Sequence, residues 1–160
     1  MEDKLFSVRD KICVITGGMG QLGAQYVKAF LSRGAKVAVF GRHVGEDKVQ
    51  KVFEKDEYES LNLKFFQVDI TSKSELNKAL AQMEEAWGTP DVLVNNAGVS
   101  YIGLLQDMSS EDWDKILHMN LTSVFNCCKL AIPYMVHQKQ GKIINISSVW
   151  GVAGASCEAA

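Results

Sequence analysis

The amino-acid sequence predicts an α/β fold built on a doubly wound parallel sheet. Short runs rich in β-branched and aromatic residues alternate along the chain with longer segments in which apolar residues recur at helical spacing. Alternation of this kind predicts parallel strands joined by right-handed crossovers, with helices covering both faces of the sheet. Ligands of such sheets bind beyond the carboxyl ends of the strands, so function is expected in the loops at those ends.

Five short segments are expected to form the strands of this sheet. Each is a mostly apolar run of five or six residues, which is typical of a strand buried on both faces. The expected strands are Lys11–Thr16 (KICVIT), Lys36–Phe40 (KVAVF), Leu63–Val68 (LKFFQV), Asp91–Asn95 (DVLVN) and Lys142–Ile146 (KIINI).

Three helices are expected between the first four strands. Met19–Ser32 has apolar residues at helical spacing and is followed by Gly34, a typical helix stop. Gly45–Glu59 is rich in charge and has only a weak apolar face. Ser72 is expected to begin the third helix, because Ser72 and Glu75 form a capping-box pattern ahead of an apolar stripe.

A long fourth helix is expected from Ser109 to about Gln138. Asp112 stands three residues after Ser109, at the capping-box position. Pro133 lies inside this segment and is expected to kink the helix or to remove one backbone hydrogen bond. The apolar face of this helix is expected to include Trp113, Ile116, Met119 and Val124.

The composition is that of an ordinary soluble protein with one domain. The chain has 160 residues and a formal net charge of −2 without a basic block, so nucleic acid is not an expected partner. No apolar stretch approaches the roughly 20 residues of a membrane-spanning helix, and the first residues lack the apolar run of a signal peptide. The spacing of the cysteines fits neither a metal site nor a disulfide framework, so reduced thiols and a cytoplasmic location are expected for Cys13, Cys127, Cys128 and Cys157.

A glycine-rich loop follows the first expected strand. In TGGMGQLG (Thr16–Gly23), the residues from Gly18 to Gly23 fit the pattern G-x-G-x-x-G between a strand and a helix. Gly18 is expected to allow the tight turn, Gly20 to let a pyrophosphate approach the backbone, and Gly23 to let the helix pack against the strand. A plain tight turn is the alternative, but the flanking strand and helix favour dinucleotide binding. The expected cofactor contacts here are Gly17, Gly18, Gly20, Gln21, Leu22 and Gly23.

The loop after the second expected strand bears on the choice of dinucleotide. An acidic residue that binds the ribose 2′-hydroxyl is expected there in NAD-dependent proteins, whereas this chain has Gly41 and Arg42. Arg42 can pair with a 2′-phosphate through two hydrogen bonds. NADP(H) is therefore favoured over NAD(H) as the cofactor, and a solvated loop arginine is the alternative interpretation of Arg42.

From Leu5 to Ala160 the sequence resembles the short-chain dehydrogenase/reductase family, in which the fold is Rossmann-like. Besides the glycine loop, VDIT (residues 68–71), NNAG (residues 95–98), MNLTSVF around Asn120 and NISSVWG around Ser148 are similar to family signatures. One departure is that the loop has Gly20 and Gln21 where the commonest family form has its glycine at the sixth position from Thr16. The resemblance implies further cofactor contacts at Asp69, Ile70, Asn96, Ala97 and Gly98, with Asp69 meeting the adenine ring.

The resemblance also implies an activity. The family transfers a hydride between a nicotinamide cofactor and a carbonyl or hydroxyl substrate, so the chain is expected to be an NAD(P)-dependent oxidoreductase that forms homodimers or homotetramers. Ser148 is expected to bind the substrate oxygen, and Asn120 to support a proton-relay water. The family's catalytic tyrosine and lysine would fall at positions 161 and 165, beyond Ala160. Residues 1–160 are therefore expected to be a dinucleotide-binding domain that lacks its C-terminal strands and helices and is inactive alone.

Two other functional interpretations remain open at this point. The chain could be a naturally shortened module that binds a nucleotide or a partner without catalysis. Glycines at positions 17, 20 and 23 also fit the spacing of epimerases and dehydratases of a related extended family, although NNAG and NISS argue against this.

Single residues also have alternative interpretations. Ser148 could instead cap a loop, and Asn120 could bond a neighbouring backbone group. Trp150 and Tyr101 could line a substrate cleft or belong to the core, and His118 is expected at the helix surface or in the core.

Overall fold

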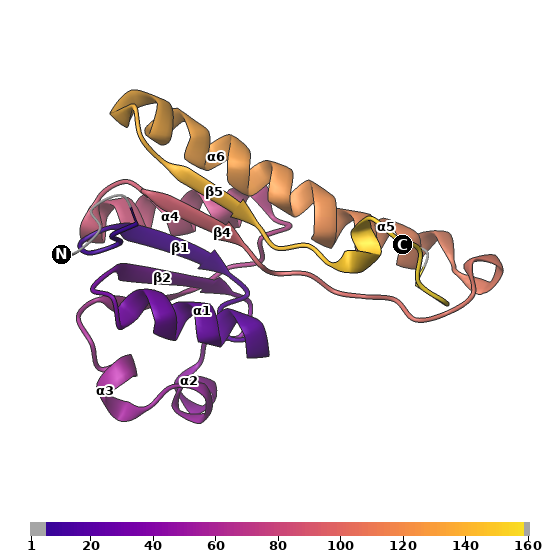
Figure 1. The fold of residues 1–160 in the computed structure, drawn as a ribbon, viewed down its shortest axis with the longest axis horizontal. Helices are drawn as coiled ribbons and strands as arrows, with labels where there is room; N and C mark the ends of the chain where they lie inside the picture. Colours follow the sequence, from indigo (N-terminus) through magenta and orange to yellow (C-terminus); the bar gives the residue numbers. More distant parts are fainter. Residues whose placement is uncertain (1–5, 159–160) are drawn as a thin grey trace.

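The computed structural model describes residues 6–158, which form one parallel sheet with helices on both faces (Figure 1). Residues 1–5 and 159–160, which belong to the expected domain 1–160, lie outside the described residues. The strand order is β3-β2-β1-β4-β5, and all pairs are parallel. The strands are β1 (Ile12–Thr16), β2 (Lys36–Gly41), β3 (Leu63–Gln67), β4 (Val92–Asn95) and β5 (Lys142–Asn145). The predicted doubly wound, Rossmann-like sheet with five strands is therefore confirmed.

Two apolar clusters form the core, one on each face of the sheet. On one face, Cys13, Ile15, Val37 and Val39 pack with α1 (Gln21–Leu31) and with the segment that includes Val49. On the other face, residues one position away in β1 and β2 pack against α4 (Lys73–Trp87) and α6 (Ser123–Gln138). Successive strand residues point to opposite faces, so these near-continuous apolar strands supply both clusters. Figure 1 shows α1 and α4 on opposite sides of the sheet.

The charged segment 45–59 forms two short helices and not the single helix that was expected. Helix α2 spans Glu46–Val52 and α3 spans Lys55–Tyr58. Between them Phe53 has extended backbone angles, with φ −117° and ψ 145°. Phe53 is buried, and its ring lies 5.5 Å from that of Phe65 in a tilted arrangement. Burial of this one large side chain explains the break, because the weak apolar face of a continuous helix offers little else to pack.

The long helix expected from Ser109 is interrupted by a turn of π-helix. Helix α5 (Ser110–Leu117) leads into η2 (His118–Thr122), which has π geometry, and then into α6. Pro133 lies within α6, which continues through it, so the change of helical register lies upstream of the proline. On the expected apolar face Ile116 is buried, whereas Trp113 is exposed. A π turn inserts one extra residue and rotates the face of the helix, and such turns often mark functional sites.

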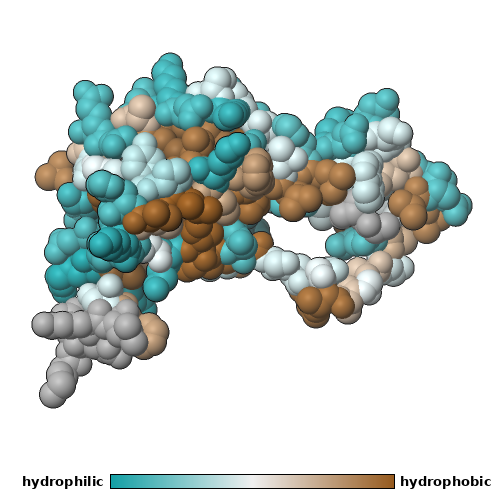
Figure 2. All heavy atoms as spheres, turned by 90° about the horizontal axis from the view of Figure 1, so that it is seen from above, coloured by the Kyte–Doolittle hydropathy of each residue, from teal (hydrophilic) through white to brown (hydrophobic). Residues whose placement is uncertain are grey.

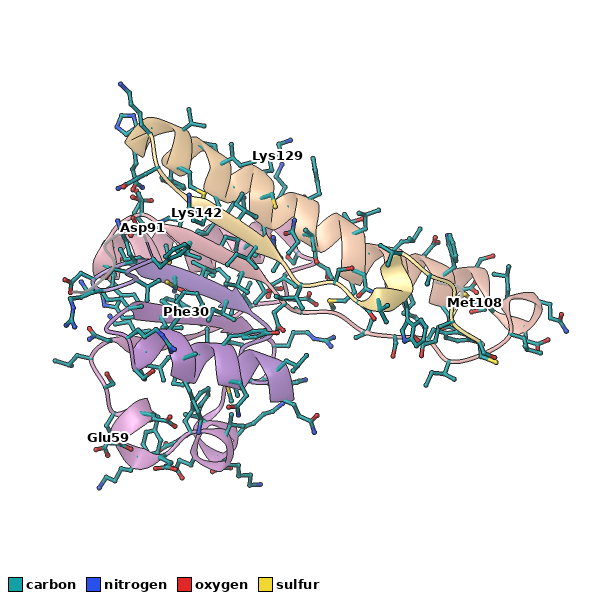
Figure 3. The ribbon with its side chains drawn as sticks, viewed as in Figure 1. Phe30, Glu59, Asp91, Met108, Lys129 and Lys142 are labelled. Carbon is teal, nitrogen blue, oxygen red and sulfur yellow. The ribbon has the colours of Figure 1, made fainter. Side chains whose placement is uncertain are left out.

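The amino edge of the sheet is tied together by Asp91, which lies at the end opposite the loops of interest (Figure 3). Its carboxylate accepts a hydrogen bond from the Ile12 N–H (2.9 Å) and pairs with Lys11 (3.2 Å). Its carbonyl accepts from the Lys142 N–H (2.9 Å). Asp91 therefore joins β1, β4 and β5 at the amino edge of the sheet.

Beyond the carboxyl edge, α5, the loop after β4 and the C-terminal segment extend away from the sheet (Figure 1). The Gly103 N–H donates to the Cys157 carbonyl at 2.8 Å, which joins the loop to the C-terminal segment. Figure 2 shows apolar side chains at the surface of this extension. The exposed large apolar residues of this part include Val99, Ile102, Leu104, Leu105, Val149, Trp150 and Val152.

Candidate functional site

Strands β1 and β4 lie side by side at the point where the strand order reverses, and a network around Thr16 holds their loops together. The buried Thr16 hydroxyl accepts hydrogen bonds from the N–H groups of Asn96 (3.0 Å) and Ala97 (3.1 Å). In return, Asn96 Nδ2 donates to the carbonyls of Thr16 (3.0 Å) and Gly17 (3.2 Å). The glycine loop and the NNAG segment are therefore fixed relative to each other at the switch point, where ligands of such sheets bind.

The sequence had suggested that Gly18 makes the sharp turn of the glycine loop. In the structure Gly17 makes this turn. Gly17 has φ +66°, a left-handed conformation that favours glycine, and a Cβ there would also lie 2.9 Å from Ala97 Cα. Gly18 has another role, because its Cβ would lie 2.9 Å from a methyl group of Val39. Gly23 allows the helix to approach the loop, since a Cβ there would overlap the Gly17 carbonyl oxygen.

Gly20 differs from these three glycines because it faces open space. It is exposed, and its Cβ would meet only the Gly17 carbonyl oxygen, at 3.4 Å. It is also the N-cap residue of α1, so it offers no side chain to cap the helix, and the first turn contains no acidic residue. The first N–H groups of a helix have no partner within the helix, and the dipole makes this end positive. The arrangement suits an anion such as a phosphate.

A cavity of about 470 Å³ opens in front of this loop. Of the cofactor contacts predicted from the sequence, all except Gly18 line it: Gly17, Gly20, Gln21, Leu22, Gly23, Gly41, Arg42, Asp69, Ile70, Asn96, Ala97 and Gly98. Sequence reasoning did not predict cofactor contacts at the other lining residues, which are Met19, Phe40, His43, Lys48, Val68, Val99 and Met119. Most of these are apolar and reach the cavity through the fold, so they had no chemical signal in the sequence.

Two cationic side chains, Arg42 and Lys48, and an imidazole, His43, lie at the β2 end of the cavity. Arg42 and His43 follow β2 directly, and Lys48 comes from α2. All three are exposed and also line an adjoining groove, where Glu46 and Asp47 lie. Within the main cavity the only carboxylate among the described lining residues is that of Asp69. This end therefore has an excess of positive charge, although the sequence had suggested Arg42 alone.

Asp69 is held at the end of β3 by two neighbours. Its carboxylate accepts hydrogen bonds from the N–H (2.9 Å) and the hydroxyl (2.7 Å) of Thr71, and its own N–H donates to the Glu75 carboxylate at 2.8 Å. Glu75 therefore does not close the capping box expected with Ser72, although the Ser72 hydroxyl still caps α4. Partial burial raises the pKa of Asp69. The hydrogen bonds from Thr71 and the charges of Arg42 and His118 together lower the pKa by more, so it lies below its ordinary value of 3.8.

Asn120 lies in η2 and binds the backbone of the loop after β4. Its Nδ2 donates to the Val99 carbonyl at 2.7 Å, and its Oδ1 accepts from the Val99 N–H at 2.9 Å. Of the two roles considered for Asn120, hydrogen bonding to a nearby backbone group is what the structure displays, although the group belongs to another segment. The pair fixes the part of the chain that runs from Gly98 along the cavity.

Ser148 is exposed and follows β5 at the same edge of the sheet. Its hydroxyl oxygen accepts from the Trp150 N–H at 3.3 Å and begins the short helix η3 (Val149–Gly151), so it does act as a cap. The O–H proton has no acceptor among residues 6–158 and is free to donate to a ligand. Trp150 is about half exposed, so it does not belong to the core, and Tyr101 lies partly buried beside Gly103.

The described residues contain no cluster of three His, Cys, Asp or Glu side chains placed to hold a metal ion. None of the helices between residues 6 and 158 has the length and apolar character needed to cross a membrane. All four cysteines are free thiols.

Curated proteins with similar sequences are oxidoreductases. The 3-oxoacyl-acyl-carrier-protein reductase FabG of Thermotoga maritima is 31% identical over 144 residues, which cover 90% of this chain and 58% of that protein. The uncharacterized oxidoreductase YgcW of Escherichia coli is 36% identical over 151 residues, which cover 93% of this chain and 56% of that protein. The chain therefore spans a little over half the length of these relatives.

Solved structures with a similar fold agree. A short chain dehydrogenase from Bacillus anthracis superposes with a TM-score of 0.84 over 95% of this chain and 61% of its own, and at 23% identity it supports the fold alone. The structure described as ElxO with NADP bound has a TM-score of 0.83 and 32% identity, over 92% of this chain and 59% of its own. A model of the short chain dehydrogenase family matches residues 11–160, and the chain belongs to this family.

Proposed function

We propose that this chain binds NADP(H) in the cavity at the switch point. In this proposal it forms the cofactor-binding part of an oxidoreductase that transfers a hydride between the nicotinamide and a carbonyl or hydroxyl carbon of a small molecule. The observation that carries the proposal is the uncapped start of α1 at Gly20, which opens onto a cavity that Arg42 also lines. The start of the helix suits a pyrophosphate, and the guanidinium of Arg42 suits a second phosphate.

The residues present fit a dinucleotide. A Cβ at Gly20 would meet almost nothing in the protein, so the space in front of the helix is free for phosphate oxygens. The neighbouring Gly17 and Gly23 are needed by the fold itself, so the open position is a specific feature of Gly20. We propose Gly17, Gly18, Gly20, Gln21, Leu22 and Gly23 as the pyrophosphate loop and Asp69, Ile70, Asn96, Ala97 and Gly98 as the further contacts, with Gly18 acting through packing.

The choice of NADP(H) over NAD(H) rests on charge. Arg42, His43 and Lys48 line the cavity where the adenosine ribose would lie, and the residue after Gly41 is not a carboxylate. A carboxylate at this position would accept from a 2′-hydroxyl and repel a 2′-phosphate. The guanidinium of Arg42 can instead donate to the phosphate. The similar structure described as having NADP bound supports this choice.

When bound, the nicotinamide supplies the hydride chemistry. The residues of this chain orient the reactants. The free O–H of Ser148 would donate to the substrate oxygen and stabilise the negative charge that develops there during reduction. Asn120 would hold the loop of Val99 in place along the cofactor cavity.

The family resemblance places the proton donor, a tyrosine, at position 161 and its lysine partner at position 165. We therefore propose that residues 1–160 bind the cofactor but do not catalyse carbonyl reduction. The substrate class, a small carbonyl or alcohol compound, is supported by the 3-oxoacyl reductases among the relatives. Free thiols throughout are in keeping with a cytoplasmic protein.

Self-association into a dimer or tetramer is part of the same proposal. The support is a row of exposed apolar residues at four- and seven-residue steps on η2 and α6, namely Leu121, Phe125, Ile132 and Val136. Large apolar patches on a surface mark sites of protein contact.

The test is a titration of residues 1–160 with NADPH and with NADH, followed by the fluorescence of the reduced nicotinamide. Tighter binding of NADPH is expected. In parallel, NADPH oxidation with ketones and 3-oxoacyl thioesters should be undetectable for residues 1–160. If neither NADPH nor NADH binds, the proposed function is refuted. If NADH binds more tightly than NADPH, the role of Arg42 is refuted. Robust turnover by a chain of verified mass would refute the proposal that the proton donor lies at position 161.

A further inference from the structure

Three polar residues are buried among residues 6–158, and one of them has no role in the site described so far. Thr16 joins the loops after β1 and β4, and Asn95 bonds Asn145 across β4 and β5. The third is Ser123, which is 0% exposed and follows the π turn η2 as the first residue of α6. Water does not reach this residue, so the partner of its hydroxyl must come from the protein.

Ser123 donates hydrogen bonds to two neighbouring carbonyls. Its N–H donates to the carbonyl of His118, five residues earlier, and this bond belongs to the π turn. Its hydroxyl donates to the carbonyl of Met119, four residues earlier. A helical serine that bonds back to the preceding turn ordinarily uses the same carbonyl as its own N–H. In this chain the two donors of Ser123 are instead divided between two carbonyls.

This division supplies the donor that the π turn takes away. In an α-helix the N–H of Ser123 would donate to the Met119 carbonyl, and its transfer to His118 leaves that carbonyl without its usual partner. The hydroxyl of Ser123 takes the place of the N–H. A residue without a side-chain donor at this position would satisfy the Met119 carbonyl best from its own N–H, which favours the ordinary α-helical bond.

The residues held by these bonds belong to the wall of the dinucleotide cavity. Met119 lines the cavity, and the next residue, Asn120, bonds both backbone groups of Val99, which also lines it. A change from π to α register removes one residue from the turn and rotates the side chains before it by about 100° relative to α6. Asn120 would then point away from Val99. Ser123 itself does not line the cavity, so it acts there through its neighbours.

We propose that Ser123 is a positioning residue for the dinucleotide cavity, and that its hydroxyl keeps η2 in π register and thereby directs Asn120 towards Val99. The effect on nucleotide binding rests on the proposed function. The link from Ser123 to Val99 stands on the hydrogen bonds alone, so the two are tested separately.

The experiment measures hydrogen exchange of the Val99 amide by NMR in the unmodified chain and in Ser123→Ala. Loss of the hydroxyl should speed this exchange about tenfold, because the bond from the Val99 N–H to Asn120 opens more often. The amide of Val14, in the core strand β1, reports on global unfolding and should change only as far as urea melts show a change in stability. A purely structural effect of the substitution would move both amides together.

Three further variants test whether the hydroxyl is the cause. Ser123→Thr keeps the hydroxyl and should restore slow exchange at Val99. Ser123→Cys has nearly the same size as serine but a weaker donor, so its exchange rate should lie between those of the unmodified chain and Ser123→Ala. Ser32→Ala is the matched control, because it removes a bond from a serine hydroxyl to the Ala29 carbonyl (3.2 Å) at the end of α1, outside the cavity, and should leave Val99 unchanged.

Titration with NADPH gives the second measurement. Affinity should fall severalfold in Ser123→Ala and recover in Ser123→Thr. If Val99 in Ser123→Ala exchanges at the rate of the unmodified chain, after allowance for global stability, the role of Ser123 is refuted whether or not a nucleotide binds. If its exchange is faster but NADPH does not bind even the unmodified chain, the positioning role stands and the proposed function fails.

Discussion

Asn120 holds Val99 by both of its backbone groups, with 2.7 Å from Asn120 Nδ2 to the Val99 oxygen and 2.9 Å from the Val99 nitrogen to Asn120 Oδ1. The two residues are 21 positions apart, one in the π-helical turn and the other in the loop after β4. Gly98, the last residue of NNAG, packs against the same amide, since a Cβ there would lie 3.3 Å from Asn120 Oδ1. The side chain therefore sets the path of the loop that lines the cavity.

Removal of this amide should loosen the loop. Asn120→Ala leaves the Val99 N–H and carbonyl without their partner, and we expect a loss of stability of about 1–2 kcal/mol, because both groups are exposed enough for water to compensate in part. Nucleotide affinity should fall as well. Asn120→Asp is the matched control, since its carboxylate still accepts from the Val99 N–H but cannot donate. Urea melts and NADPH titrations of the two variants measure both effects, and unchanged values for Asn120→Ala would contradict the role.

Valine at Gly20 and at Gly23 should have opposite consequences. Gly20→Val places its side chain in open space, so the domain should fold normally while nucleotide affinity falls more than tenfold, because the phosphates can no longer approach the backbone. Gly23→Val overlaps the Gly17 carbonyl and should destabilise the fold itself. Circular dichroism melts combined with NADPH titration separate the two outcomes. Undiminished affinity in Gly20→Val would mean that the loop does not hold the pyrophosphate.

The sheet could be predicted from the sequence because its signal is local. Each buried parallel strand is a continuous apolar run, and all five expected strands are present within two residues of their expected ends. The glycine pattern likewise indicated the right loop. It did not indicate which glycine turns, because Gly17 and Gly18 are adjacent and only the backbone angles distinguish them.

Features that depend on tertiary packing could not be predicted. The helical pattern through 45–59 gave no sign that the chain would become extended to bury Phe53 against Phe65. The π turn at His118–Thr122 changes hydrogen-bond register without changing residue type, so apolar spacing does not reveal it. His118 was expected at the helix surface or in the core, and it is exposed at the start of this turn.

Arg42 should determine most of the preference between the two dinucleotides. Arg42→Ala removes a charge-assisted hydrogen bond worth about 1.5–3 kcal/mol, so the ratio of NADPH to NADH affinity should fall by roughly 10- to 100-fold while NADH binding changes little. Arg33→Ala is the matched control, because Arg33 is exposed and bonds the Ala29 carbonyl at the end of α1, outside the cavity. An unchanged ratio in Arg42→Ala would show that His43 and Lys48 suffice or that no 2′-phosphate binds there.

The low pKa of Asp69 should appear in acid. Partial burial raises this pKa, but the hydrogen bonds from Thr71 and the charges of Arg42 and His118 bring it below 3.8. A carboxyl whose pKa is lowered by folding stabilises the folded protein at pH values above the pKa of the unfolded chain. This contribution is lost as the pH falls through the pKa of the folded state. Thr71→Val removes the hydroxyl donor and keeps the N–H, so the pKa of Asp69 should rise towards 3.8. Carbon-13 NMR titration of the Asp69 carboxyl measures the pKa directly, and an unchanged value would contradict the assigned cause.

Burial should protect two of the four thiols from alkylation. Burial and the nearby Asp91 charge raise the pKa of Cys13 to about 12. Burial and, to a smaller extent, the neighbouring Cys128 raise the pKa of Cys127 to about 12. At pH 8 the reactive thiolate is then a fraction on the order of 10⁻⁴ for these two residues. Iodoacetamide should therefore leave Cys13 and Cys127 unmodified in the native protein while the partly exposed Cys157 reacts.

The same pKa values predict how stability responds to alkali. A thiol whose pKa is raised by folding contributes stability below its ordinary value of about 9, and this contribution is lost as the pH rises from there towards about 12. Cys13→Ala and Cys127→Ala should each be less stable than the unmodified chain at pH 7, because each leaves a small cavity, and the difference should shrink by pH 10. Urea melts at pH 7 and pH 10 measure this difference in stability.

For the alkylation experiment, mass spectrometry identifies the labelled cysteines. Modification of native Cys13 as fast as Cys157 would show that β1 opens readily, which contradicts its place in the core.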